Sequence, residues 1–175
     1  MNYQPDKNSR EYLENQFHSG RMNLLMMISF TVTNIVLLLA ESGLYFLFSA
    51  TIPYFLAALG AEMDMQLGGS TYVTTAVVVC AVILGVYLLL WFLSKKRPGM
   101  LYVAFGLFAL DTVALLAMAL LAGGLVEEIV NIIFHGWVLF SLFQGARCGG
   151  KLKNMPEATP ITGADYTGTS PELDM

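Results

Sequence analysis

The feature that most constrains this chain is a series of long stretches with almost no charge. Met22–Ala40 has no charged residue, and as a helix it would extend about 28 Å, close to the thickness of a bilayer's hydrocarbon core. Similar stretches follow at 72–94, 100–122 and 129–146, and Asp111 is the only charged residue among them. We therefore predict an all-α fold, a polytopic transmembrane helix bundle with four spans.

The composition agrees with a surface that faces lipid. Apolar residues make up 56% of the chain and charged residues 13%, and the mean hydropathy is +0.63. A soluble domain has about 25% charged residues because water must wet its surface. The few basic residues form no stripe, so we expect the lipid bilayer as a partner and no nucleic acid.

The chain divides into three regions. Residues 1–21 are polar and are expected to be a cytoplasmic lead-in at the membrane surface, followed by the transmembrane bundle at 22–146. Residues 147–175 form a cytoplasmic tail. From about residue 154 this tail carries three prolines, four acidic residues and no basic residue, so we expect it to be disordered.

The segment 42–61 allows two interpretations. It is uncharged and long enough to cross a bilayer, but it contains Pro53 and is rich in aromatic residues. The aromatic residues are Tyr45, Phe46, Phe48, Tyr54 and Phe55. Aromatic side chains at this density favour the headgroup layer, so we interpret the segment as interfacial or re-entrant on the outer side, before an acidic loop at 62–64. The alternative is a hairpin turn at 41–43 that leads into a true span.

The distribution of charge predicts the orientation. All nine Lys and Arg residues lie in three clusters: Lys7, Arg10 and Arg21; Lys95, Lys96 and Arg97; Arg147, Lys151 and Lys153. Four spans place these clusters on one side and leave only acidic residues on the other. Basic residues beside spans stay in the cytoplasm, which predicts a multi-pass plasma-membrane protein with both termini inside. A fifth span at 42–61 would break this pattern.

Several polar residues lie within the predicted spans. Asp111 is about 17 Å below the outer end of its helix, near the midplane, so it should face the bundle interior or be protonated. Asn131 and His135 share a helical face with Glu128. Asn34 lies at a depth similar to that of His135, about 9 Å.

These positions predict an intramembrane polar cluster in the outer half of the bundle: Asn34, Asp111, Asn131 and His135. Its outer acidic rim would consist of Glu41, Glu127 and Glu128. The depths do not imply direct contact between Asp111 and His135, and they leave room for a bridging water or for Asn34. The cluster could be a vestibule for protons or cations. It could equally be a set of interhelical hydrogen bonds, each worth about 0.6 kcal/mol, which is the interpretation favoured for Asn34 and Asn131.

No catalytic or cofactor motif supports an enzyme. The sequence contains no phosphate-binding glycine loop, serine elbow, paired-cysteine site or helical HExxH, so we expect no cofactor and no metal. One His near one acid is short of the three or four ligands of a metal site. We interpret the chain as a small non-enzymatic membrane subunit or interaction protein, in a homo-oligomer or a larger complex. The alternative is a proton- or cation-conducting bundle that uses Asp111 and His135.

One resemblance accompanies this interpretation. The stretch His135–Leu139, followed by Gly145 and the basic exit to Leu152, resembles the last span of small uncharacterised multi-span membrane proteins of Gram-positive bacteria. Phe48–Tyr54 has a similar character. The resemblance implies a bacterial plasma membrane and transfers no activity.

Overall fold

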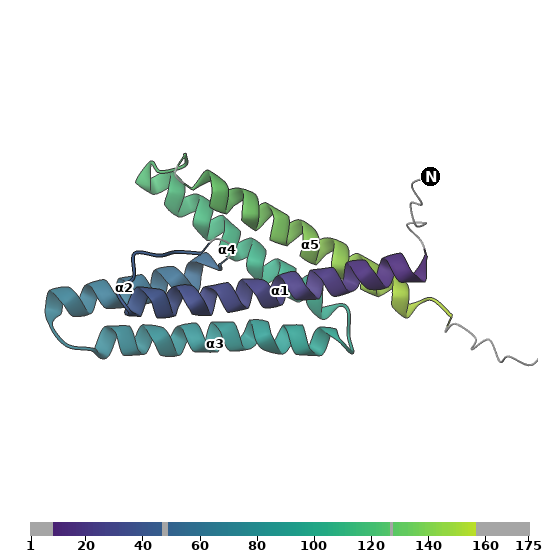
Figure 1. Ribbon diagram of the computed structural model, residues 1–175, viewed down its shortest axis with the longest axis horizontal. Coiled ribbons are helices and arrows are strands. Elements are labelled where there is room, and N and C mark those ends of the chain that lie inside the picture. Colours follow the sequence, from purple (N-terminus) through teal and green to yellow (C-terminus); the bar gives the residue numbers. More distant parts are fainter. Residues whose placement is uncertain (1–8, 47–48, 127, 157–175) are drawn as a thin grey trace, which may run out of the picture.

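The protein is a bundle of long helices (Figure 1). The computed structural model describes residues 9–46, 49–126 and 128–156. Within these ranges the elements are α1 (Arg10–Leu39), α2 (Thr51–Leu67), α3 (Thr71–Ser94), α4 (Met100–Ala122) and α5 (Ile129–Lys153). Helices α1, α3, α4 and α5 are long and apolar enough to cross a membrane, whereas α2 has 17 residues. The prediction of a helical bundle with four candidate spans is confirmed.

The two ends of the bundle differ in charge. The start of α1, the turn between α3 and α4 and the end of α5 lie at one end, and the turns after α2 and α4 lie at the opposite end (Figure 1). We call the first the basic end, because it holds Lys95, Lys96, Arg97, Lys151 and Lys153. We call the second the acidic end, because it holds Glu41, Glu62 and Glu128.

Two helices extend beyond the predicted spans. Helix α1 begins at Arg10, where the Ser9 side chain accepts a hydrogen bond from the backbone N–H of Tyr12, and it continues unbroken through the predicted boundary at residue 22. It is thus longer than the span predicted at 22–40. Helix α5 continues to Lys153 rather than ending at 146. The tail beyond residue 156, for which we expected disorder, lies outside the described residues.

The segment 42–61 divides into two parts. Its described residues before Thr51 are not helical, and α2 then runs to Leu67. The expected acidic loop at 62–64 is wrong, because these residues belong to the last turns of α2 and Asp64 is only 9% exposed. Pro53 lies in the first turn of α2, where a missing backbone N–H costs the helix no hydrogen bond.

Helices α1 and α5 approach each other closely at a pair of glycines. The Cα atoms of Gly20 and Gly145 are so near that a Cβ built on either would lie 3.0 Å from the other residue's Cα. A Cβ on Gly20 would also lie 2.9 Å from the Ser141 carbonyl oxygen. Small residues therefore set the spacing of this helix pair, as is common between membrane helices.

An apolar layer fills the bundle interior between this contact and the half of the bundle nearer the acidic end. Its side chains are at most 2% exposed and come from α1, α4 and α5: Leu24, Met27, Ala104, Phe108, Val138 and Leu142. We call these six residues the inner apolar layer. They separate the polar groups near the acidic end from the basic end.

Candidate functional site

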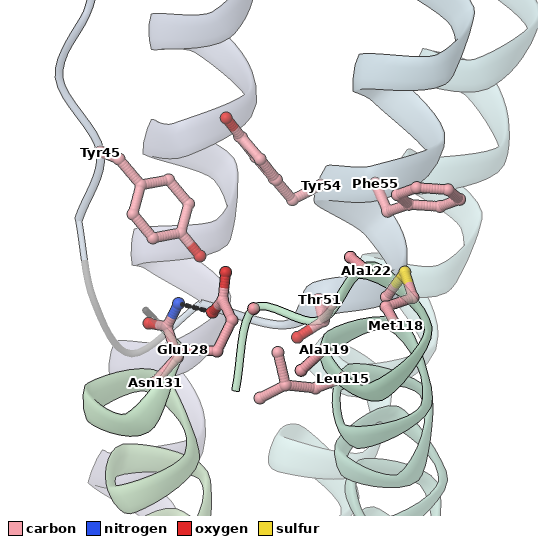
Figure 2. Close-up of a pocket in the computed structure, with 11 residues that line it drawn as sticks. Tyr45, Thr51, Tyr54, Phe55, Leu115, Met118, Ala119, Ala122, Glu128 and Asn131 are labelled. Atoms are coloured by element: carbon pink, nitrogen blue, oxygen red, sulfur yellow. Dashed lines mark hydrogen bonds between the residues drawn. The ribbon is translucent and has the colours of Figure 1, made fainter. Parts of the chain in front are cut away.

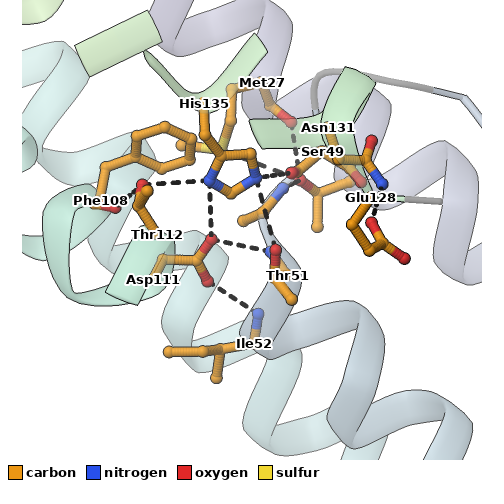
Figure 3. A network of polar contacts seen from close by, with 12 residues as sticks. Met27, Ser49, Thr51, Ile52, Phe108, Asp111, Thr112, Glu128, Asn131 and His135 are labelled. Carbon is orange, nitrogen blue, oxygen red and sulfur yellow. Dashed lines mark hydrogen bonds and ion pairs between the residues drawn. The ribbon is translucent and has the colours of Figure 1, made fainter. Parts of the chain in front are cut away.

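Asp111 caps the first turn of α2 from another helix. Its carboxylate accepts the backbone N–H of Thr51 at 2.8 Å and the N–H of Ile52 at 2.7 Å (Figure 3). Ala50, at the N-cap of α2, offers no side-chain acceptor, and the third residue, Pro53, has no N–H. The free donors of this helix start are thus satisfied by one buried carboxylate, whose negative charge also suits the positive end of the helix dipole.

His135 lies beside this carboxylate and contacts the chain just before α2. Its Nδ1 is 3.9 Å from Oδ2 of Asp111, and its Nε2 is 3.2 Å from the Ser49 carbonyl oxygen. Nδ1 is also 3.1 Å from the Thr112 hydroxyl, and the ring stacks on Phe108 with centroids 4.8 Å apart. Asp111 and His135 therefore approach each other without Asn34 as a bridge. The depths of the two residues along their helix axes had suggested a gap between Asp111 and His135. Those depths refer to the backbone and leave out the length of the side chains.

Asn34 and Thr31 hold the same segment from α1. The Asn34 side chain donates to the Phe46 carbonyl at 2.6 Å and accepts the Phe46 N–H at 2.7 Å. The Thr31 hydroxyl accepts the Ala50 N–H at 2.8 Å and donates to the Met27 carbonyl at 2.8 Å. Asn34 thus acts on Phe46 as a neighbouring strand would, by pairing with both of its backbone polar groups.

These contacts define a re-entrant segment, whose described residues are 42–46 and 49–67. From the acidic end the chain runs inward past Asn34 and Thr31 to Asp111, and α2 then returns to the acidic end (Figure 1). Non-helical backbone at membrane depth is tolerated only where protein groups satisfy it. Four side chains that are at most 3% exposed do so here: Thr31, Asn34, Asp111 and His135. The arrangement supports the structural interpretation of the polar cluster.

The fourth predicted member of the cluster lies elsewhere. Asn131 donates to the Glu128 carboxylate at 2.6 Å, nearer the acidic end, and does not join the contacts around Asp111. Of the predicted acidic rim, Glu128 lies at this site, while Glu41 is exposed beyond the end of α1. Glu127 lies outside the described residues.

A cavity of about 480 Å³ opens beside Glu128 (Figure 2). Tyr45 comes from the non-helical part of the re-entrant segment, Tyr54 and Phe55 from α2, and Glu128 from the start of α5. The remaining lining residues are Thr51, Leu115, Met118, Ala119, Ala122, Gly124 and Asn131. The cavity is therefore mainly apolar and aromatic, with few polar groups.

Two polar contacts connect the cavity with its surroundings. The Thr51 hydroxyl lies 3.4 Å from Nε2 of His135, so Thr51 joins the cavity to the buried contacts of Asp111. The Tyr45 hydroxyl is 2.9 Å from the Ser49 hydroxyl. Burial raises the pKa of Tyr45 above its ordinary value, and the charge of Glu128 raises it further, so this phenol stays neutral.

Sequence reasoning missed two parts of the site. Asp64 was assigned to an outer loop, although it accepts the N–H of Tyr72 at 3.0 Å and of Val73 at 2.8 Å and so caps α3. The spacing of Asp64 before the Gly68–Gly69 turn and the next apolar run was a local signal for this role. The aromatic cavity was also missed, because its walls come from four parts of the chain.

The fold and the site define the class: a polytopic α-helical membrane protein with a re-entrant helix that is capped by buried side chains of the spans. Among the described residues, no group of three or more His, Cys, Asp or Glu side chains could hold a metal ion. Comparisons with protein-family models, curated proteins and solved structures found no match to this chain.

Proposed function

We propose that the protein is a small non-enzymatic subunit of a plasma membrane, which associates with a second copy or with a larger membrane partner. One observation carries this proposal: Asp111 and His135, two buried titratable residues, bond the backbone of the re-entrant segment. Side chains whose polar atoms already bond the backbone hold the fold in place, which favours a structural role over a catalytic one.

The inner apolar layer argues against the alternative, conduction of protons or cations. An open conducting path needs polar groups or water along its whole length, and an apolar constriction closes it. Between Asp111 and the basic end, the interior is closed by side chains such as Phe108 and Leu142, which are 1% and 0% exposed. The polar groups of the outer half therefore end at an apolar barrier.

An apolar groove between α1 and α3 supports association within the membrane. It has a volume of about 420 Å³ and is lined by aliphatic side chains of both helices, including Val32, Ile35 and Leu84, together with Cys80. Ala81 and Gly85 form part of its wall, and a Cβ on Gly85 would meet no atom within 4 Å. Small residues at this spacing let another apolar helix approach closely, so we assign the groove to a transmembrane helix.

The test of association compares two exposed glycines. Gly85→Leu fills the groove, whereas Gly106→Leu places the same side chain on α4, where a Cβ also meets open space. We expect Gly85→Leu to reduce co-purifying partners or the oligomer mass in mild detergent, and Gly106→Leu to leave both unchanged. Equal behaviour of the two variants, or a wild-type protein that is monomeric and free of partners in native membranes, would contradict the proposal.

Flux measurements test the conducting alternative directly. Wild-type protein in liposomes should show no more pH-dependent proton or cation flux than empty vesicles. If wild-type vesicles conduct and Asp111→Asn abolishes the flux while folding and oligomer state stay intact, the subunit proposal fails.

The proposed orientation places the basic end in the cytoplasm, because basic residues beside spans are retained there. The buried residues Cys80 and Cys148 are first replaced by alanine, and Met65→Cys and Lys96→Cys are then made separately. Met65 is 80% exposed near the acidic end, and Lys96 is exposed at the basic end. In intact cells an impermeant maleimide should label the Met65→Cys protein and not the Lys96→Cys protein. The reverse labelling would invert the orientation.

A further inference from the structure

We propose that the cavity beside Glu128 binds a monovalent organic cation, a primary or quaternary ammonium group attached to an apolar body. This inference does not depend on the subunit proposal. A volume of about 480 Å³ lies in the range of small-molecule sites, about 300–1,000 Å³, and such sites combine apolar walls with a few polar groups.

The charge of the cavity favours a cation. Glu128 bonds Asn131 at 2.6 Å, and among the described residues it has no Lys or Arg partner. The described basic residues lie at the other end of the protein or, in the case of Arg21, near Ser94 at the end of α3. Apolar walls limit the hydration of the Glu128 carboxylate. The carboxylate therefore repels anions and attracts a positively charged group, which compensates for the missing water.

The aromatic residues specify which kind of cation fits. The rings of Tyr45 and Tyr54 meet edge to face with centroids 5.0 Å apart, and both line the cavity with Phe55 (Figure 2). Aromatic faces attract ammonium groups, and the preference is strongest when water is excluded. A divalent metal ion fits poorly, because the described residues that line the cavity include one carboxylate and no histidine or cysteine.

The cavity also has an apolar wall, formed by α4, against which the apolar part of the ligand can lie. Leu115 and Ala119 are each 4% exposed and line the cavity from α4, next to Met118. An aliphatic or aromatic body can lie against this wall while the ammonium group faces Glu128 and the tyrosines. The ammonium group could come from a soluble amine or from the headgroup of a lipid such as phosphatidylethanolamine.

Binding is tested on the full-length protein in nanodiscs of phosphatidylglycerol, a lipid without an ammonium group. The probe is radiolabelled benzyltrimethylammonium, and the competitor is neopentylbenzene, its neutral isostere. We expect saturable binding of the cation and displacement by the neutral isostere only at concentrations about tenfold higher or more. Absence of saturable binding, or equal displacement by the isostere, would overturn the proposal.

Variants assign the binding to the cavity. Glu128→Gln should weaken binding about tenfold or more, whereas Glu62→Gln, an exposed acid that bonds Gln66, should not change it. Tyr45→Leu should weaken binding, and Tyr45→Phe, which keeps the ring, should retain most of it. Each variant is first compared with wild type in helix content and thermal stability. A folded Glu128→Gln protein with wild-type affinity would refute the assignment.

A second lipid identifies the source of the ammonium group. Phosphatidylglycerol nanodiscs with an added fraction of phosphatidylethanolamine are compared with nanodiscs in which a neutral galactolipid replaces that fraction, so that the surface charge is the same. A phosphatidylethanolamine headgroup that occupies the cavity would compete with the probe and lower its apparent affinity. Unchanged affinity would indicate a soluble amine as the ligand. Both results support a cation site and differ only in which cation fills it.

Discussion

Asp64 and Asp111 have the same role at the starts of two different helices. Asp111 accepts the first two backbone N–H groups of α2, and Asp64 accepts those of Tyr72 and Val73 at the start of α3. In both helices the residue at the N-cap position makes no side-chain cap of its own. Asp64 lies near the end of α2, so the re-entrant helix is capped by one aspartate and supplies the other.

The first prediction concerns Asp111. Asp111→Leu leaves the N–H groups of Thr51 and Ile52 buried without an acceptor, and each such group costs about 1–3 kcal/mol. We expect a loss of about 3 kcal/mol in the free energy of unfolding, with a smaller loss for Asp111→Asn, which keeps one acceptor oxygen. Reversible unfolding in mixed micelles, followed by far-UV circular dichroism, measures both.

The control for Asp111 is its neighbour Leu110, which is 65% exposed on the face of α4 that points away from the bundle. Leu110→Ala should change stability by much less. If Asp111→Leu proves as stable as wild type, the carboxylate does not hold the start of α2.

Asn34 gives a second prediction. Asn34→Leu removes both hydrogen bonds to the backbone of Phe46, whereas Asn34→Asp can accept the N–H but cannot donate to the carbonyl. We expect hydrogen exchange at the Phe46 amide to accelerate about tenfold or more in Asn34→Leu, equivalent to about one hydrogen bond of local stability, and less in Asn34→Asp. Thr33→Val is the matched control, because the exposed Thr33 hydroxyl bonds the Ser29 carbonyl of its own helix. Equal exchange in Thr33→Val and Asn34→Leu would contradict the assigned role.

The four spans were predictable because a long uncharged stretch has few stable environments other than lipid. Each predicted stretch matches a helix of the structure except at its ends: Ala40 lies just past the end of α1, and α5 continues through Arg147 to Lys153. The sequence analysis placed the end of the span before the first basic residue, Arg147. In the structure the helix continues through the basic residues and so extends beyond its apolar part.

The re-entrant helix was one of the predicted interpretations, but its start could not be located from the sequence. Ala50 and Thr51 carry no strong local start signal, since the cap comes from Asp111, 60 positions away. The pairing of Asn34 with Phe46 is also non-local. Propensity and periodicity describe neighbours along a helix and do not reveal which distant side chain will satisfy a buried backbone group.

A third prediction tests Asp64. Asp64→Ala should destabilise the start of α3 by about 1 kcal/mol, the usual worth of an N-terminal cap, and Asp64→Asn should recover part of it because its one amide oxygen can accept one of the two N–H groups. Faster hydrogen exchange at the Tyr72 and Val73 amides is the expected signature. Glu62→Ala, two residues earlier and exposed, should leave these amides unchanged. If both alanine variants raise the exchange equally, the effect is one of net charge and the cap assignment fails.

The last prediction concerns the contact between α1 and α5. Gly20→Ala places a Cβ 2.9 Å from the Ser141 carbonyl oxygen and 3.0 Å from the Cα of Gly145, and both are backbone atoms that cannot rotate away. The helices must separate, so we expect a loss of about 1–3 kcal/mol. Gly136→Ala is the control on α5, where a Cβ meets no atom within 4 Å. It should be neutral or stabilise by up to about 1 kcal/mol through helix propensity.

The double variant with Gly20→Ala and Gly145→Ala tests whether the two glycines act as a pair. Once the helices have separated to admit one methyl group, the second meets less resistance, so the combined loss in unfolding free energy should be smaller than the sum of the single losses. Unfolding in mixed micelles of all four variants provides the comparison. Strict additivity, or a Gly20→Ala protein no less stable than Gly136→Ala, would mean that α1 and α5 are not held at the separation that the Gly20–Gly145 contact requires.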